Sequence, residues 1–483
     1  MTRPVLTAKP AAAGGAAGLL LPLIEQLFRG DLPLRVRAWD GSEAGPAGAP
    51  VLVLRSRQAL RRIMWHPGEL GIAQAYVTGE LDVEGDLTEG LRSVWRAARA
   101  SAPADDAPAR LNASQVPGGR LSPGLLTAGR LSPGLLAAGG LAAGRLAVAR
   151  LKEAAPLPPE LWGDAIRAAI TLGIPGPRPK APASEARISG RLHSKTRDRA
   201  VIAHHYDVPP AFYQLILDPQ MAYSSGYWTS AGSGYTLEDA QRDKLDQICR
   251  KLALGPGMRL LDIGCGWGSL TIHAAQQHGA HVTAVTLSRE QAGHVRKRAA
   301  DAGLSGLVEV RNQDYRDIAA GQYDAVASVE MGEHVGAGQY PVFCRLIRRQ
   351  LRPGGRVLIQ QMSRSSNAPG GGKFIEAYIA PDMHMRPVGE TAGLIESAGL
   401  EVRDIEAMRE HYPPTIRAWL GNLERKWDRA VGLIGRESAR VWRLYLAGGA
   451  LAFEEGRMGV DQILAVRPSA SGQSGFSLTA RSL

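Results

Sequence analysis

Between about residue 193 and residue 470, short apolar runs alternate with amphipathic stretches, a pattern typical of a parallel sheet covered by helices. Thr236 and Asp239 form the start signal of a helix whose apolar residues continue to Leu252. A helix-rich insertion rich in Trp and Tyr follows at about 412–455. We therefore expect an α/β domain with a mostly parallel sheet. The predicted strands are 258–263, 281–287, 307–311, 323–329, 355–362 and 401–406.

The N-terminal part of the chain predicts a separate, smaller α+β domain. Residues 34–39 and 51–54 read as strands, and Asp40-Gly41 supplies a turn signal between them. A chain of 483 residues is long enough for two or three domains. The expected segments are a disordered tail at 1–18, the small domain at 19–100, a linker at 101–185, the α/β domain at 186–470 and a disordered tail at 471–483.

The linker prediction rests on composition. Residues 101–185 are rich in Ala, Gly, Pro and Arg, and the sequence Leu-Ser-Pro-Gly-Leu-Leu occurs at 121–126 and again at 131–136. Two short copies are too few for a solenoid, and Pro-Gly pairs break helices, so a flexible linker is favoured. A segment whose leucines and arginines touch lipid is the alternative.

Charge and cysteine content narrow the location and the partners. The net charge of +11 predicts attraction to nucleic acid or to an anionic membrane, although an Arg-rich composition can also reflect a GC-rich genome. Basic and aromatic residues do not interleave as in RNA-binding proteins, which disfavours nucleic acid. Cys249, Cys265 and Cys344 are widely spaced, so neither a disulfide framework nor a metal site is predicted. No apolar run is long enough for a transmembrane helix, and we expect a cytoplasmic protein.

One turn carries most of the chemical information. The strand-like run Leu260–Ile263 opens into a G-x-G-x-G turn and then a helix, an arrangement that brings backbone N–H groups close to a ligand. The next strand, 281–287, completes a βαβ unit. A dinucleotide site would need a glycine at 269 and an acidic residue at the end of that strand, where this chain has Ser269 and Thr286. NAD is therefore disfavoured, and a Rossmann-like methyltransferase using S-adenosylmethionine is predicted.

Several blocks in one order resemble the cyclopropane-fatty-acyl-phospholipid synthase family. The resemblance runs through roughly 193–465 and implies a class I methyltransferase fold with a helical acyl-binding insertion. It also implies methylene transfer from S-adenosylmethionine to the cis double bond of a phospholipid acyl chain, by an enzyme attached peripherally to an anionic membrane. A homodimer is one open possibility. The matching blocks are 205–207, 217–219, 221–228, 260–268, 313–317 and 328–336.

The resemblance also implies which residues hold the cofactor. Two of them have structural alternatives, because Gln291 lies three residues after Ser288, as in a capping box, and an Asp such as Asp314 is common in turns. The implied contacts are Tyr223 and Ser224 to the methionine part, Asp262, Gly264, Gly266 and Gly268 in the central cradle, Thr286 and Gln291 to the ribose hydroxyls, and Asp314 and Tyr315 to the adenine.

Members of this family hold a bicarbonate ion as the base that removes a proton. Glu333 matches the glutamate that anchors this ion, and Tyr412 matches the tyrosine that reaches it. His334 is either a second base or a structural histidine. Methylating an alkene requires a poor nucleophile to be aligned with the sulfonium methyl group in a dry pocket, with aromatic faces and a positioned base.

The chain departs from the family pattern at three positions near this base. Ser225 stands where the family often has Cys, Gln360 where it has His, and Gly332 where it commonly has Phe. Gln360 removes a ligand of the bicarbonate site, and relatives that make methyl- or methylene-branched chains have similar residues there. Cyclopropane formation is predicted first and methyl branching second. A third alternative is a small-molecule N-methyltransferase, because Glu330, Glu333 and His334 give a Glu-x-x-Glu-His pattern.

Overall fold

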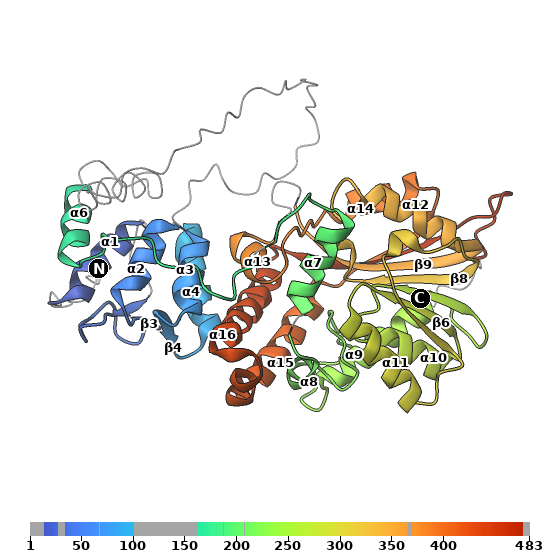
Figure 1. Cartoon of the computed structure of the whole chain (residues 1–483), viewed down its shortest axis with the longest axis horizontal. Coiled ribbons are helices and arrows are strands. Elements are labelled where there is room, and N and C mark those ends of the chain that lie inside the picture. Colours follow the sequence, from blue (N-terminus) through green and yellow to red (C-terminus); the bar gives the residue numbers. More distant parts are fainter. Residues whose placement is uncertain are drawn as a thin grey trace, which may run out of the picture. The chain divides into compact units, whose positions relative to one another are not determined.

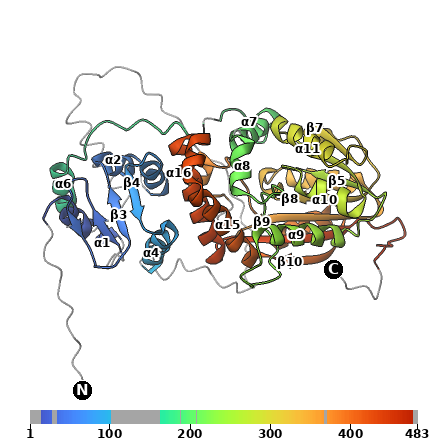
Figure 2. The ribbon, with the colours of Figure 1, turned by 90° about the horizontal axis from the view of Figure 1, so that it is seen from below.

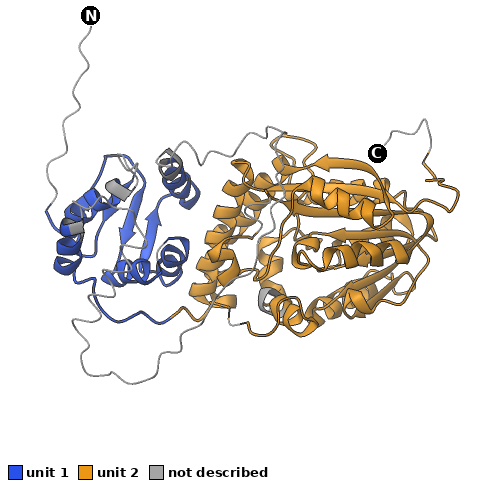
Figure 3. Ribbon diagram, turned by 90° about the horizontal axis from the view of Figure 1, so that it is seen from above, with its two compact units in different colours: residues 1–180 blue, residues 181–483 orange. Residues whose placement is uncertain are grey.

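The computed structural model describes two compact units, residues 1–180 and 181–483 (Figure 3). The Leu-Ser-Pro-Gly-Leu-Leu repeat lies outside the described residues, as do positions 1–13 and 477–483 of the two predicted tails. The described residues are 14–27, 34–66, 68–100, 162–186, 188–206, 208–365 and 370–476.

The first unit is a small α+β fold built on a sheet with strand order β2-β1-β3-β4. Both predicted strands are present, and β1 pairs with β3 in parallel while β2 and β4 are antiparallel to their neighbours. Its strands are β1 (Arg35–Arg37), β2 (Glu43–Ala44), β3 (Val51–Leu54) and β4 (Leu81–Glu84), and its described helices are α1 (Ala16–Leu27), α2 (Arg57–Trp65), α3 (Glu69–Val77), α4 (Leu87–Ala100) and α6 (Trp162–Thr171).

The C-terminal part of the predicted linker is ordered and packs in this unit. Helix α6 forms there, and Leu172 and Ile174 behind it are buried. The side chain of Arg61 on α2 donates to the backbone oxygen of Ile174 at 3.0 Å, and Trp65 donates to that of Gly176 at 3.2 Å. The composition of this stretch hid a short amphipathic helix, because its Ala and Leu are helix formers as well as linker residues.

The second unit is an α/β fold around a sheet with strand order β10-β11-β9-β8-β5-β6-β7. Strands β9, β8 and β6 of this sheet are labelled in Figure 1. All six predicted strands are present, and only β11 runs antiparallel to its neighbours β9 and β10. Sequence reasoning missed β11, because it lies inside the sheet and lacks the alternation of a half-exposed strand. The strands are β5 (Arg259–Ile263), β6 (His281–Thr286), β7 (Val308–Asn312), β8 (Tyr323–Val329), β9 (Leu351–Ser363), β10 (Glu401–Ala407) and β11 (Gly459–Val466).

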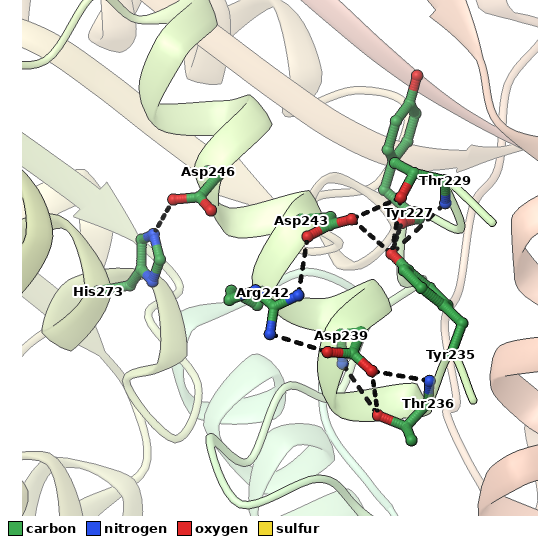
Figure 4. A network of polar contacts seen from close by, with 9 residues as sticks. All are labelled: Tyr227, Thr229, Tyr235, Thr236, Asp239, Arg242, Asp243, Asp246 and His273. Carbon is green, nitrogen blue, oxygen red and sulfur yellow. Dashed lines mark hydrogen bonds and ion pairs between the residues drawn. The ribbon is translucent and has the colours of Figure 1, made fainter.

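Helices cover both faces of this sheet. Residues of α9 (Leu237–Lys251) and α10 (Ser269–His278) pack with β5 and β8 in one buried cluster, and residues of α12 (Tyr340–Gln350) and α14 (Val388–Ser397) pack on the other face. Helix α11 (Arg289–Asp301) follows β6. The predicted start of α9 is confirmed, because Thr236 and Asp239 cap each other's backbone N–H groups (Figure 4).

The predicted helical insertion consists of α15 (Tyr412–Arg425) and α16 (Trp427–Glu454), which pack against each other and against α8 (Pro210–Ile216) (Figure 2). Gly435 interrupts α16 with a φ of +78°. No helix in the described part of the chain is long and apolar enough to cross a membrane. The remaining helices are α7 (Lys195–Tyr206), α13 (Lys373–Tyr378) and three short 3₁₀ turns, η3 (Tyr315–Asp317), η4 (Gly332–His334) and η5 (Arg409–His411).

Candidate active site

A cavity lies at the carboxyl edge of the parallel strands, where open α/β sheets bind ligands. The ends of β5, β6 and β8 and the segment after β7 all contribute to its lining. Tyr223 and Ser224, from the segment that precedes α9, also line it. Of the thirteen residues that the sequence pointed to, nine line this cavity: Tyr223, Ser224, Asp262, Gly264, Gly266, Thr286, Gln291, Tyr315 and His334.

The glycine turn approaches the cavity closely because its backbone is left-handed. A Cβ on Gly264, at φ +83°, would lie 2.7 Å from the Met331 side chain. A Cβ on Gly266, at φ +53°, would meet nothing within 4 Å, so this residue borders open space. Gly268 does not line the cavity. A Cβ there would lie 2.8 Å from Val295, so this glycine permits close packing of the turn on α11.

Thr286 and Gln291 form a polar corner of the cavity. The Thr286 hydroxyl donates to Gln291 Oε1 at 2.7 Å. Within the described residues the buried Nε2 of Gln291 has no hydrogen-bond partner, which leaves a donor for a ligand hydroxyl. The Gln291 backbone N–H also donates to Ser288 Oγ at 3.2 Å, so the capping interaction predicted as an alternative is present as well. This corner fits the ribose of S-adenosylmethionine.

The structure places Asp314, a predicted adenine contact, beside the cavity and not in its lining. Asp314 is buried, and its carboxylate accepts hydrogen bonds from both the Nε and Nη2 atoms of Arg316, at 2.8 and 2.6 Å. It does not line the cavity, because this ion pair holds it in the turn before η3. Tyr315 and Gln313 line the cavity in its place. Gln313 lies in the matching block 313–317 but was not predicted as a cofactor contact.

Lys244 is a second residue that sequence reasoning missed. It lies on α9 with an exposed fraction of 1%, lines the cavity, and donates to Ser224 Oγ at 2.8 Å. Burial lowers the pKa of its ammonium group to about 8, against the attraction of Glu330, Asp218 and Asp262. Burial also raises the pKa of Asp262 to about 6. A lysine four residues before Ile248 on an apolar helix face was the available signal.

Aromatic rings surround the Tyr223 side of the cavity. The Tyr223 ring lies 5.6 Å from Tyr213, 5.4 Å from Trp419 and 5.9 Å from Trp442, measured between ring centroids. Tyr213 lies 5.1 Å from Trp267, which lines the cavity in the glycine turn. Helices α8, α15 and α16 supply three of these rings, so the helical insertion builds an aromatic wall behind the site.

The carboxylate of Glu330 lies at the centre of the predicted catalytic region. Its Oε1 accepts from the Ser225 backbone N–H and from Gln360 Nε2, each at 2.9 Å, and its Oε2 accepts from the Tyr412 hydroxyl. Glu330 lines the cavity. The three residues that the resemblance placed around a bicarbonate ion therefore surround this side chain. The carboxylate uses the donors that such an ion would need, and the residues present do not fit bicarbonate.

Glu333, the predicted anchor, lies elsewhere. Its exposed fraction is 1%, it does not line the cavity, and one carboxyl oxygen accepts from the Met362 backbone N–H. Burial and the charge of Glu330 raise its pKa to about 8, so it is protonated at neutral pH. Tyr412, which was paired with Glu333 in the sequence reading, contacts Glu330. Of the two glutamates in the Glu-x-x-Glu-His pattern, Glu330 lines the cavity and Glu333 does not.

Two nearby residues complete this part of the site. His334 lines the cavity, and burial lowers its pKa to about 4, so its ring is neutral near pH 7. At Gly332 a Cβ would lie 2.2 Å from Gln361 Oε1, which explains why a larger residue such as Phe is absent. Gln361 accepts a hydrogen bond from the Tyr340 hydroxyl at 2.6 Å, so this oxygen is fixed.

The structure brings Cys249 together with His273 and His278, with potential ligand atoms within 4.8 Å of one another. The sequence predicted no such group, because the spacing between the cysteine and the histidines matches no metal motif. The Asp246 carboxylate accepts a hydrogen bond from the Nε2 atom of His273 at 2.7 Å (Figure 4). Burial raises the pKa of the Cys249 thiol and lowers that of His273.

Solved structures share this architecture. The cyclopropane synthase MmaA2 from Mycobacterium tuberculosis superposes with a TM-score of 0.53 at 27% identity, covering 57% of this chain and 99% of that one. The mycolic acid cyclopropane synthase CmaA1, complexed with SAH and CTAB, gives 0.52 at 28% identity, covering 55% and 97%. The fold and the cavity define a class I methyltransferase that uses S-adenosylmethionine.

Sequence comparison identifies the family. A sequence model described as mycolic acid cyclopropane synthetase matches residues 193–463, and the chain belongs to this cyclopropane synthase family. It is 35% identical over 456 residues to the probable fatty acid methyltransferase Rv3720 of Mycobacterium tuberculosis, which covers 93% of this chain and 94% of that protein. It is also 35% identical over 263 residues to the cyclopropane-fatty-acyl-phospholipid synthase of Escherichia coli K12, covering 54% and 66%.

Proposed function

We propose that the protein transfers the methyl group of S-adenosylmethionine to the cis double bond of an unsaturated acyl chain in a phospholipid. The observation that carries this proposal is a cavity that combines a cofactor cradle, aromatic rings and a carboxylate that forms no ion pair with a basic side chain of the described residues. When bound, S-adenosylmethionine supplies an electrophilic methyl group. Gln291, Thr286 and the turn at 264–266 would hold it, and Tyr223 and Ser224 would face its methionine part.

The aromatic wall suits this reaction because methyl transfer to an alkene leaves a positive charge on the substrate. A ring within about 6 Å of a cation stabilises it by roughly 0.5–2 kcal/mol, most strongly when water is excluded. Tyr223 and Trp267 face the cavity, and Tyr213 and Trp442 hold the Tyr223 ring in place. Aromatic rings also stabilise the ammonium product of an amine, so the small-molecule methyltransferase alternative is placed last by the relatives named fatty acid methyltransferases and not by the wall.

The product of our first proposal is a cyclopropane fatty acid, formed when the new methyl group loses a proton and closes the ring. A second product, a methyl- or methylene-branched chain, is favoured by a specific observation. The relatives that match this chain over nearly its whole length are named probable fatty acid methyltransferases, from Mycobacterium tuberculosis and Pseudomonas putida. Gln360, in place of the family histidine, distinguishes this site from a bicarbonate-dependent one.

We further propose that the protein acts at an anionic membrane surface as a peripheral protein. Its net charge of +11 supports this, since each basic residue near an anionic surface contributes about 1 kcal/mol. The acyl chain would leave the bilayer to reach the cavity. A homodimer stays a prediction that light scattering would test.

The direct test is incubation with S-adenosylmethionine and vesicles of a cis-monounsaturated phospholipid, followed by mass spectrometry of the released fatty acids. A gain of one CH₂ with loss of the double bond means cyclopropane formation. The same gain with a double bond retained means methylene branching. No product from any unsaturated phospholipid, together with turnover of a small amine, would contradict the proposal and favour the small-molecule alternative.

A further inference from the structure

Glu330 has a strained backbone at the edge of the cofactor cavity. Its φ is +50°, in the left-handed region that favours glycine, and it follows directly after strand β8. Residues other than glycine rarely adopt this conformation, and such strain clusters at functional sites. The Glu330 N–H donates to the Gln360 backbone oxygen at 2.6 Å, which fixes the turn. The fold therefore tolerates an unfavourable backbone to place this side chain.

Three donors from different elements hold the carboxylate. Ser225 precedes α9, Gln360 is on β9 and Tyr412 begins α15. The Gln360 amide is itself oriented, because its oxygen accepts from Gln462 Nε2 at 3.0 Å, which turns its NH₂ group toward Glu330. A carboxylate can accept about four hydrogen bonds. Three are used here. Because Glu330 lines the cavity, its remaining lone pair is available to accept a proton there.

The electrostatic surroundings favour an ionised Glu330 over an ionised Glu333. Burial raises the pKa of Glu330, while the hydrogen bonds from Tyr412, Ser225 and Gln360 and the nearby charge of Lys244 lower it. Glu333 accepts only from backbone N–H groups, Met362 first, and its second carboxyl oxygen has no partner among the described residues. When two carboxyl groups share a region, only one ionises readily. The hydrogen-bond donors around Glu330 therefore favour Glu330 as the ionised carboxylate of the two.

We propose that Glu330 is the catalytic base of this enzyme, and that its carboxylate replaces a separately bound anion. This inference rests on the proposed function. The π electrons of the substrate double bond form a bond to the methyl carbon, the carbon–sulfur bond breaks, and its electron pair stays on sulfur. The positive charge is then on the neighbouring chain carbon. A proton of the new methyl group passes to a Glu330 oxygen, and the C–H electron pair closes the ring.

The same base serves the branched product. If a hydride first moves from the methylated carbon to its charged neighbour, the positive charge lies on the carbon that carries the methyl group. Loss of a methyl proton to Glu330 then leaves a C=CH₂ group instead of a ring. Atoms and charges balance in both cases, with S-adenosylhomocysteine and one proton released. No oxidant or reductant is needed.

The test compares Glu330→Gln, Glu330→Ala and Glu333→Gln with the wild type. Initial rates are measured with S-adenosylmethionine and cis-monounsaturated phospholipid vesicles, and cofactor affinity is measured by calorimetry. We expect Glu330→Gln to lose about a hundredfold or more in kcat, as for other general bases. Its Kd for S-adenosylmethionine should change less than threefold. Glu333→Gln, which makes the same change of shape at a carboxyl group that already holds a proton near pH 7, should lose less than tenfold.

Chemical rescue separates a catalytic from a structural role, because an added anion restores the rate only if the lost carboxylate acts as a base. Glu330→Ala leaves the donors of Ser225, Gln360 and Tyr412 around an empty carboxylate position. Added formate or bicarbonate should restore its rate at least tenfold and raise its Tm, with no effect on the wild type. Near-full turnover of Glu330→Gln, an equal loss in Glu333→Gln, or absence of rescue with wild-type dependence on bicarbonate would overturn the inference. If the wild type makes no product from any unsaturated lipid, the proposed function fails together with it.

Discussion

Replacing Glu333 with Gln tests the reading of the two glutamates through stability, without any substrate. In the folded protein the pKa of Glu333 is raised from 4.5 to about 8, by burial first and by the charge of Glu330 second. Between these two values the folded state holds a proton that the unfolded state has released. The free energy of unfolding therefore falls as the pH rises from about 4.5 to about 8, and Gln, which stays neutral, removes this loss.

The size of the effect follows from the width of that window. One pKa unit corresponds to about 1.4 kcal/mol, so the 2.5 units between 4.5 and pH 7 give a destabilisation of about 3 kcal/mol in the wild type. The charge of Glu330 is coupled to this shift, which makes the figure an upper bound. At roughly 2–4 °C per kcal/mol for a domain of this size, the Tm of Glu333→Gln should exceed that of the wild type by several degrees at pH 7.

Thermal unfolding from pH 5 to pH 8 measures this difference directly. The gap between variant and wild type should be small at pH 5 and should widen with pH. Glu410→Gln is a matched control, because the Glu410 side chain is 70% exposed and should leave the pH profile unchanged. Parallel profiles for Glu333→Gln and wild type would refute a buried protonated Glu333. A fall in Tm at every pH would show instead that the ionised carboxylate stabilises the fold.

Three further predictions address the cofactor and the membrane. Gly266→Val should abolish binding of S-adenosylmethionine in calorimetry, because a branched residue at φ +53° would be strained and would enter the cavity; unchanged binding would contradict the cradle. Gln291→Leu should weaken cofactor binding about tenfold with little change in Tm, since it removes the unpaired Nε2 donor, and equal affinity would exclude a ribose contact. Binding to anionic vesicles should exceed binding to neutral ones in sedimentation and should fall with salt, whereas equal binding at low salt would count against the charge argument.

The sequence by itself determined the α/β fold and the location of the cofactor turn. Periodicity in the chain gave six of the seven strands of the second unit, and the run from Leu260 to Gly268 identified the ligand edge, because strand-to-glycine-to-helix patterns depend on neighbouring residues. The fold class and the S-adenosylmethionine chemistry are thus local in origin. Strand β11 was missed, because its partners β9 and β10 are far from it in sequence and its buried pattern has no alternation.

Only the tertiary structure decided which carboxylate faces the cavity. Glu330 and Glu333 are three residues apart, and both fit the motif, so their roles depend on donors brought from Ser225, Gln360 and Tyr412. Those contacts join residues more than 29 positions apart, which no local pattern encodes. In the same way Asp314 was predicted as a ligand contact, but it accepts hydrogen bonds from Arg316 and does not line the cavity. Side-chain pairing of this kind is set by the packing of distant segments. A buried charged group is costly unless it is hydrogen-bonded, so its partner is whichever donor the fold places beside it.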